Sequence, residues 1–333
     1  MNHHILNKFV FFRWYRLILH TRYHLKRGAL SAVFFLATGL SGNVLCLATE
    51  SLPSLPTGQS LEDNTALQKK TIAKTADFSQ LLDEHGFELE NVRSSGLVPP
   101  IFAVNLPSDL FTLPTASKTS LFIRLLIPHV VSVNDGILQV RKELQHLAGK
   151  IGEGKKLNAS ENEWLVDLAK DYSGDVNNLD DLLSRVDIIP NALVLAQAID
   201  ESGWGTSHFA IAGNALYGEH LPAQSKGKFI ATPGGNVRVA AFDSIYHGTA
   251  NYVHNLNSTK AYRELREDRR QSRASKNNLS GHELAGSLAA YSALGEKYVH
   301  TLRSIITRYR LDAFDNARID NTSSGLLVEF TRK

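Results

Sequence analysis

Residues 190–218 read PNALVLAQAIDESGWGTSHFAIAGNALYG, and the helix within this stretch sets the fold class of the chain. Pro190 suits the start of a helix, where its missing N–H costs no hydrogen bond. The residues that follow are apolar on almost every side, which is typical of a helix buried in a protein core. Ser202-Gly203 then marks the end of the helix. The sequence therefore predicts a buried helix between Pro190 and Gly203.

Two polar side chains interrupt this apolar helix. Gln197 and Glu201 are four residues apart and so share one helix face. A carboxyl held against apolar surface has a raised pKa and stays able to donate a proton to a leaving oxygen near neutral pH. Trp204 is placed to stack on a sugar ring. The pattern indicates a glycosidase acid, whereas the structural alternative is a helix-end carboxyl paired with an arginine, with Trp204 as packing.

Helical periodicity dominates the chain on both sides of this stretch. It predicts helices over residues 119–147, 179–185, 244–256, 260–272, 281–290 and 296–309, with Pro128 expected to kink or split the first of them. Alternating apolar residues around a glycine turn predict a β-hairpin within 228–242. The predicted fold class is therefore α+β and mostly α, a helical domain with an inserted β-hairpin lobe.

The N-terminal residues differ from this domain in composition. Six Lys and Arg residues and no Asp or Glu precede Glu50, and without these six charges the formal net charge of +3 becomes −3. The basic balance therefore gives no support to nucleic-acid binding. An uncharged apolar run, 28–48, follows, so residues 1–48 are predicted to be a signal peptide cut after Ala48 or an uncleaved anchor. Both place the rest of the chain in the periplasm, with inner-membrane association in the second case.

The remaining boundaries follow from composition. Residues 49–96, rich in small polar residues at their start, are predicted to be a flexible linker and surface segment. The main domain is predicted over 97–315, with the prolines of 97–114 indicating an extended segment on its surface. Residues 316–333 are predicted to be a polar C-terminal tail.

One cysteine excludes a disulfide framework. The spacing of a metal site is also missing from His208, His220, His247 and His254, so no metal is expected.

Residues 196–207, AQAIDESGWGTS, resemble the A-Q-A-x-x-E-S-G-W-G-x-S signature of bacterial peptidoglycan β-N-acetylglucosaminidases, glycoside hydrolase family 73. Residues 213–218 are similar to the family's G-N-N-x-F/W-G turn, with Ala215 in place of its second Asn. Tyr291-Ser292 and Tyr298 also resemble family positions. The apolar leader and the helical segment before the catalytic part are most similar to the Bax-type members. The resemblance covers about residues 97–311.

This resemblance implies a lysozyme-like fold and hydrolysis of the β-1,4 bond between N-acetylglucosamine and N-acetylmuramic acid in peptidoglycan, with no cofactor. It makes Glu201 the catalytic acid. The residues expected to bind substrate are Gln197, Trp204, Asn214, Tyr217, Tyr291 and Tyr298.

A second carboxylate is harder to assign. Family members usually carry a Glu on the hairpin, where this chain has Val237-Arg238-Val239. Glu219 and Asp243 are the candidates to orient a water for an inverting attack, which needs two carboxyls about 6.5–9.5 Å apart. Otherwise the N-acetyl group of the substrate assists. Two alternatives stay open: a lytic transglycosylase or muramidase, and a cell-wall binding module without catalysis.

Overall fold

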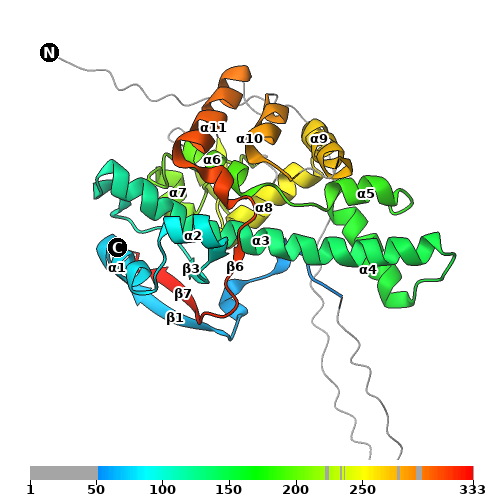
Figure 1. The fold of residues 1–333 in the computed structure, drawn as a ribbon, viewed down its shortest axis with the longest axis horizontal. Coiled ribbons are helices and arrows are strands. Elements are labelled where there is room, and N and C mark those ends of the chain that lie inside the picture. Colours follow the sequence, from blue (N-terminus) through cyan, green and yellow to red (C-terminus); the bar gives the residue numbers. More distant parts are fainter. Residues whose placement is uncertain are drawn as a thin grey trace, which may run out of the picture. The chain divides into compact units, whose positions relative to one another are not determined.

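The computed structural model describes residues 52–221, 225–232, 235, 237–275, 278–289 and 295–332, and its centre is the long helix α3 (Figure 1). The helices are α1 Thr75–Glu84, α2 Leu89–Ser95, α3 Thr115–Gly152, α4 Ala159–Asp171, α5 Leu179–Arg185, α6 Asn191–Ser202, α7 His208–Gly213, α8 Ile245–Ser258, α9 Arg263–Ala274, α10 Gly281–Leu284 and α11 Glu296–Tyr309. The strands are β1 Leu67–Ile72, β2 Leu97–Val98, β3 Ile101–Ala103, β4 Phe229–Ala231, β5 Arg238–Ala240, β6 Arg318–Ile319 and β7 Gly325–Phe330. The prediction of a mostly helical α+β fold with an inserted hairpin is confirmed.

Helix α6 is the buried helix that the sequence predicts. Residues 192–198 are wholly buried, and the helix ends at Gly203 in the left-handed conformation. It packs against α3, α10 and α11. Because α6 is apolar on nearly every side, it is enclosed on nearly every side, and only its last turn reaches the surface.

Of the kink or split predicted at Pro128, the split does not occur, because helix α3 continues through this proline. A proline inside a helix costs about 3 kcal/mol. Leu125, Leu126, Ile127 and Val130 around it are wholly buried, and each such side chain contributes about 1.5–3 kcal/mol. Packing therefore outweighs the lost hydrogen bond.

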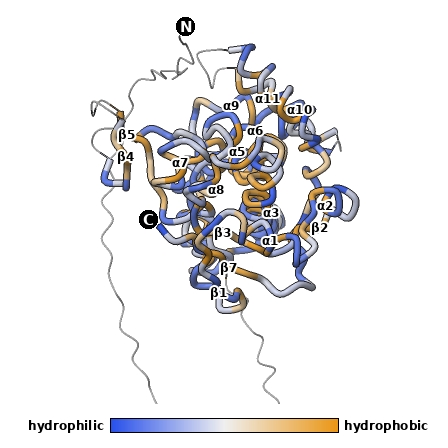
Figure 2. Tube along the Cα trace, turned by 90° about the vertical axis from the view of Figure 1, so that its left-hand side faces the viewer, coloured by the Kyte–Doolittle hydropathy of each residue, from blue (hydrophilic) through white to orange (hydrophobic). Residues whose placement is uncertain are grey.

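Helix α3 is long and apolar enough to cross a membrane, but 83% of its most apolar window is buried inside the domain. Figure 2 shows it as a largely hydrophobic tube among the other elements.

The prediction of a flexible linker over 49–96 is wrong for residues 52–96. They form β1, α1 and α2, and the side chains of Phe78, Leu82 and Phe87 are wholly buried in the main core. Strand β1 has mostly exposed residues, including Lys69 and Lys70, because it lies at a sheet edge. Its local composition therefore resembles that of a linker although its backbone is fully paired with a neighbour.

The prediction of a polar tail over 316–333 is also wrong. Strand β7 is the middle strand of a parallel sheet with the order β1-β7-β3, and β6 pairs with β2. Leu326, Leu327, Val328 and Phe330 are buried. Residues 97–114 likewise do not lie on the surface throughout, since all residues of β3 are buried. The predicted domain boundaries of 97 and 315 thus cut through one structural unit, which begins at residue 52.

The hairpin of β4 and β5 lies beside α7 (Figure 2). Ile230 pairs with Val239, and the Cδ1 atom of Ile230 fills the space where a Cβ at Gly213 would be, at 2.7 Å. Residues 219–221 run along the other edge of β5. The N–H of Ala240 donates to the carbonyl of Glu219 over 2.8 Å, and the N–H of Leu221 donates to the carbonyl of Arg238 over 2.8 Å. The hairpin therefore gains a third, short strand that contains Glu219.

Candidate active site

Glu201 lies in the last turn of α6 and is half-buried. Burial raises the pKa of its carboxyl to about 7, and the neighbouring charge of Asp200 adds to the rise. The hydroxyl of Tyr298 donates to Oε1 of Glu201 over 3.1 Å and opposes this shift. Among the described residues no cation lowers the pKa of Glu201. The side chain is therefore neither free in solvent nor paired with an arginine, and it carries a proton at neutral pH for much of the time.

A chain of hydrogen bonds between buried polar groups holds the hydroxyl of Tyr298 in place. The amide of Gln197 donates to the hydroxyl of Tyr298 over 3.1 Å, and the hydroxyl of Tyr252 donates to the Gln197 carbonyl oxygen. Gln197 is wholly buried. The structure thus brings Gln197 and Tyr298 together with Glu201. For Gln197 this follows the prediction from the sequence, because Gln197 and Glu201 are four residues apart on one helix face. Their contacts hold the carboxyl in place, and neither side chain is exposed as expected for a substrate-binding residue.

Glu219 directly follows a glycine turn that passes beside the carboxyl of Glu201. Gly218 has a φ of +64°, and a Cβ built on it would lie 3.7 Å from Oε2 of Glu201, so the backbone of this turn passes directly beside the carboxyl. Desolvation raises the pKa of the next residue, Glu219, to about 7, while hydrogen bonding by the Asn255 side chain and the charge of His254 lower it. Two carboxyls with raised pKa values therefore flank one glycine turn.

Tyr262 links the two carboxyls electrostatically. Burial raises the pKa of its phenol to about 12, and negative charge on both Glu219 and Glu201 contributes to the rise. The phenol therefore lies within electrostatic reach of both groups. Sequence reasoning missed Tyr262 and Tyr252, because each stands in a helical pattern that looks like ordinary packing. A buried tyrosine acquires a partner only through the tertiary fold.

Tyr217 and Asn214 hold the segment that leads to the Gly218 turn in place. The ring of Tyr217 stacks on Tyr252 with a centroid distance of 4.0 Å and an interplanar angle of 2°, and its hydroxyl donates to Thr249 over 3.2 Å. Asn214 ends α7 in the left-handed conformation and donates to the carbonyl of Phe242 over 3.1 Å. Both side chains are buried. Their contacts hold the segment that leads to Gly218 and Glu219, and their predicted roles in substrate binding stay predictions.

Trp204 is half-buried and packs against the core through its indole ring. Its indole makes edge contacts with Phe122, at 6.1 Å, and with Tyr309, at 4.7 Å. Tyr309 is eleven residues after Tyr298 on α11, which is about 16 Å along the helix axis. The alternative of a packing tryptophan is therefore the one that the structure supports.

Asp243 and Tyr291 are the remaining residues that the sequence predicts for the site. The side chain of Asp243 is exposed and forms an ion pair with Lys228. Tyr291 lies outside the described residues. In the described part of the chain no three His, Cys, Asp or Glu side chains are grouped as a metal site.

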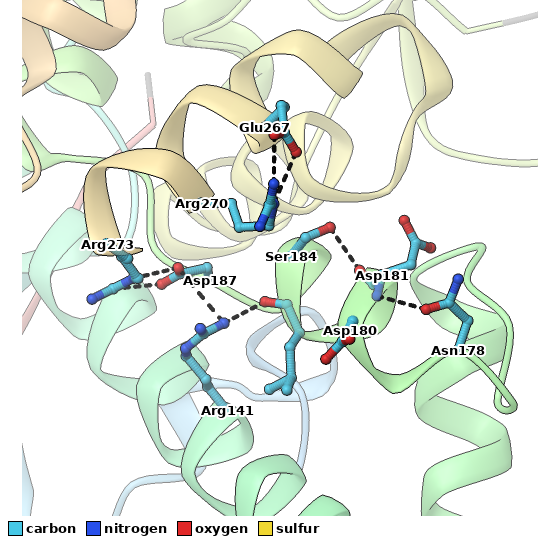
Figure 3. A pocket seen from close by; sticks show the side chains of 10 residues that line it. Arg141, Asn178, Asp180, Asp181, Ser184, Asp187, Glu267, Arg270 and Arg273 are labelled. Atoms are coloured by element: carbon cyan, nitrogen blue, oxygen red, sulfur yellow. Dashed lines mark hydrogen bonds and ion pairs between the residues drawn. The ribbon is translucent and has the colours of Figure 1, made fainter. Parts of the chain in front are cut away.

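A hollow of about 440 Å³ lies elsewhere, among α3, α5 and α9 (Figure 3). Arg273 binds both oxygens of Asp187 over 2.5 and 2.6 Å, and Arg141 donates to backbone carbonyls and lies 3.6 Å from Asp187. Arg270 pairs with Glu267. All three arginines are engaged with the protein itself, and Arg141 and Arg273 tie α3 and α9 to the segment that precedes α6.

Comparisons with known proteins show which family the chain belongs to. The Glucosaminidase family, described as mannosyl-glycoprotein endo-beta-N-acetylglucosaminidase, matches residues 176–311. Protein bax of Escherichia coli (strain K12) is 32% identical over 197 residues, which are 57% of this chain and 69% of that protein. Among solved structures, the glycoside hydrolase domain of Salmonella typhimurium FlgJ, C-terminally truncated, is 21% identical, with 43% of this chain and 96% of that chain covered and a TM-score of 0.30. A peptidoglycan hydrolase from Sphingomonas sp. A1 is also 21% identical, with 44% and 83% covered and a TM-score of 0.29.

The protein is thus a glycoside hydrolase. It belongs to the glucosaminidase family, as the resemblance of residues 196–207 predicts. Residues 52–175, with β1, α1 and α3, precede the part that matches the family.

Proposed function

We propose that the protein is an exported peptidoglycan hydrolase that cleaves the β-1,4 bond between N-acetylglucosamine and N-acetylmuramic acid, with Glu201 as the general acid. The observation that carries this proposal is the half-buried carboxyl of Glu201, whose pKa of about 7 is set by burial and not by a cation. Such a carboxyl keeps its proton at neutral pH until a leaving oxygen takes it. The relatives that act on peptidoglycan by their printed names support the choice of substrate.

Glu219 is the second carboxylate in this proposal. In its ionised form it accepts a proton from the attacking water, while Glu201 protonates the glycosidic oxygen. The two pKa values are both raised to about 7, so near neutral pH one proton is available for two carboxyls.

The proposed periplasmic location rests on residues 1–48. Their basic start and the apolar run 28–48 have the pattern of an export signal or an N-terminal anchor. Fractionation of cells that produce the protein with a C-terminal epitope, followed by protease treatment of spheroplasts, tests it. Cleavage of the epitope from outside supports export, and protection in intact spheroplasts contradicts it.

Product analysis tests the reaction. The purified full-length protein is incubated with peptidoglycan sacculi, and the released glycans are reduced with borohydride and identified by mass spectrometry. A reducing N-acetylglucosamine end is expected. Anhydro-muramyl ends would indicate a lytic transglycosylase, and reducing muramic acid ends a muramidase; either result overturns the proposed bond.

Substitution of the acid tests its role. Glu201→Gln keeps the shape of the side chain and removes the proton, and we expect a decrease in kcat of about 10²–10⁴-fold. Glu163→Gln, at an exposed position of α4, is the matched control and should retain full activity. Binding of the unmutated protein to sacculi without any turnover would contradict the catalytic proposal.

A further inference from the structure

Phe229, the first residue of β4, presents a large apolar ring to solvent. It is 44% exposed, although most phenylalanines of the domain are buried. The next residue, Ile230, points the other way and packs against α7 at Gly213. The hairpin therefore has one face that is fixed to the domain and one face that carries Phe229.

The register of the hairpin places Phe229 in one row with Glu219. Phe229 pairs with Ala240, and the N–H of Ala240 donates to the carbonyl of Glu219, while His220 is opposite Val239. Residues opposite one another on adjacent strands share a face of the sheet. Phe229, Ala240 and Glu219 therefore lie on the same face, with the Cα atoms of Phe229 and Glu219 two strand spacings apart, about 10 Å.

Two neighbours on the hairpin surround the ring of Phe229. Ala240, between Glu219 and Phe229, is small and buried, with 5% of its surface exposed. The guanidinium carbon of Arg238 lies 3.5 Å from the ring centroid of Phe229, which covers one side of the ring and holds it by a cation–π contact. The exposed part of the ring is then available to a flat apolar surface from outside.

We propose that Phe229 is a sugar-stacking platform of the glycan-binding surface and takes an N-acetylated hexose next to the bond that is cleaved. This inference rests on the proposed function and names a contact to the same substrate. The C–H face of a pyranose ring is apolar and stacks on an aromatic ring, while its hydroxyl and N-acetyl groups stay in contact with water and polar side chains. Phe229 thereby takes the role that the sequence suggests for Trp204.

Binding in an inactive background tests the platform without turnover. Glu201→Gln is titrated with a hexamer of β-1,4-linked N-acetylglucosamine by calorimetry, alone and combined with Phe229→Ala, Phe229→Leu or Phe229→Trp. We expect binding that is roughly two- to tenfold weaker for Ala and Leu, and binding at least as strong as that of Phe for Trp. Phe111→Ala is the control, because Phe111 is 63% exposed and lies outside the hairpin; it should not change the affinity.

Two outcomes separate this inference from the proposed function. In the active protein, Phe229→Leu should raise KM on glycan strands several-fold with kcat nearly unchanged, because the ring contacts substrate and not the reacting atoms. Unchanged affinity and KM for both Phe229→Ala and Phe229→Leu, in proteins with unaltered melting temperatures, overturn the platform even if the protein is a fully active hydrolase. Absence of hydrolysis by the unmutated protein would instead contradict the proposed function.

Discussion

The hydroxyl of Tyr298 donates a hydrogen bond to Glu201 and accepts one from Gln197, so the start of α11 is joined to the end of α6 at the candidate acid. A phenol has one proton to donate and lone pairs to accept with, and this arrangement uses both. The direction of the bond matters, because a donor to a carboxylate stabilises its charged form. Tyr298 therefore limits how far burial raises the pKa of Glu201.

Tyr298→Phe should move the pH profile of the enzyme. Without the donor, the pKa of Glu201 rises, and the alkaline limb of kcat/KM, where the acid loses its proton, shifts to higher pH. The measurement is kcat/KM on solubilised glycan strands from pH 5 to 9. Tyr309→Phe, on the same helix beside Trp204, is the control and should leave the limb in place. A limb that stays fixed in both variants would contradict the role of Tyr298.

The two candidate bases can be compared directly. Glu219→Gln should lower kcat by about 10²–10³-fold, because the water loses its proton acceptor. Asp243→Asn removes only an exposed ion pair with Lys228 and should change kcat less than twofold, since exposed pairs contribute about 0–1 kcal/mol to stability. Near-normal kcat in Glu219→Gln would exclude Glu219 as the base and favour assistance by the N-acetyl group of the substrate.

Glu201→Gln should stabilise the fold while it lowers activity. The pKa of Glu201 rises from 4.5 to about 7 on folding, so the folded state binds the proton more tightly. This contribution to stability is present below pH 4.5, is lost as the pH rises towards 7, and stays absent above it. At pH 8 the variant should therefore be more stable than the unmutated protein by about 1–3 kcal/mol of unfolding free energy, and it should melt at a higher temperature. At pH 4 the two proteins should melt at the same temperature. Equal stability at both pH values would contradict the buried setting of Glu201.

A contact between Phe78 of α1 and Phe330 of β7 reports on the two parts of the chain whose composition suggests a linker and a tail. Their rings meet edge to face with centroids 5.1 Å apart, and both are buried. Each substitution to Ala should cost about 3–5 kcal/mol of unfolding free energy, with a coupling between them of about 0.5–1.5 kcal/mol in a double-mutant cycle. Denaturant unfolding measures these values, and Phe111→Ala, at an exposed position, should cost little. Costs below 1 kcal/mol at Phe78 and Phe330 would show that these segments do not pack as described.

The sequence predicts the elements whose cause is local. Helix α6, its end at Gly203, the hairpin and the raised pKa of Glu201 all depend on residues within one short stretch or on simple periodicity. The sheet of β1, β7 and β3 joins opposite ends of the chain, so no local pattern reveals it. The same holds for Trp204, because whether an indole meets a sugar or a protein ring depends on where α3 and α11 place Phe122 and Tyr309.

Asp243 and Glu219 could not be distinguished by sequence for a related reason. Both follow short apolar runs near the hairpin, and both are carboxylates at the end of a turn. Backbone pairing with β5 places Glu219 against the domain, whereas Asp243 stays in solvent just before α8. Their different electrostatics arise from tertiary position and not from residue type.

The central place of β7 has a consequence for the order of folding during synthesis. Both β1 and β3 pair only with this strand in their sheet, and it is the last element of the chain. While the polypeptide is still growing on the ribosome, the first strand has nothing to join, and the sheet closes only once residue 330 has emerged. A premature stop codon before Gly325 would therefore leave β1 and β3 without their partner strand and prone to aggregation, even though every residue around Glu201 had already been made.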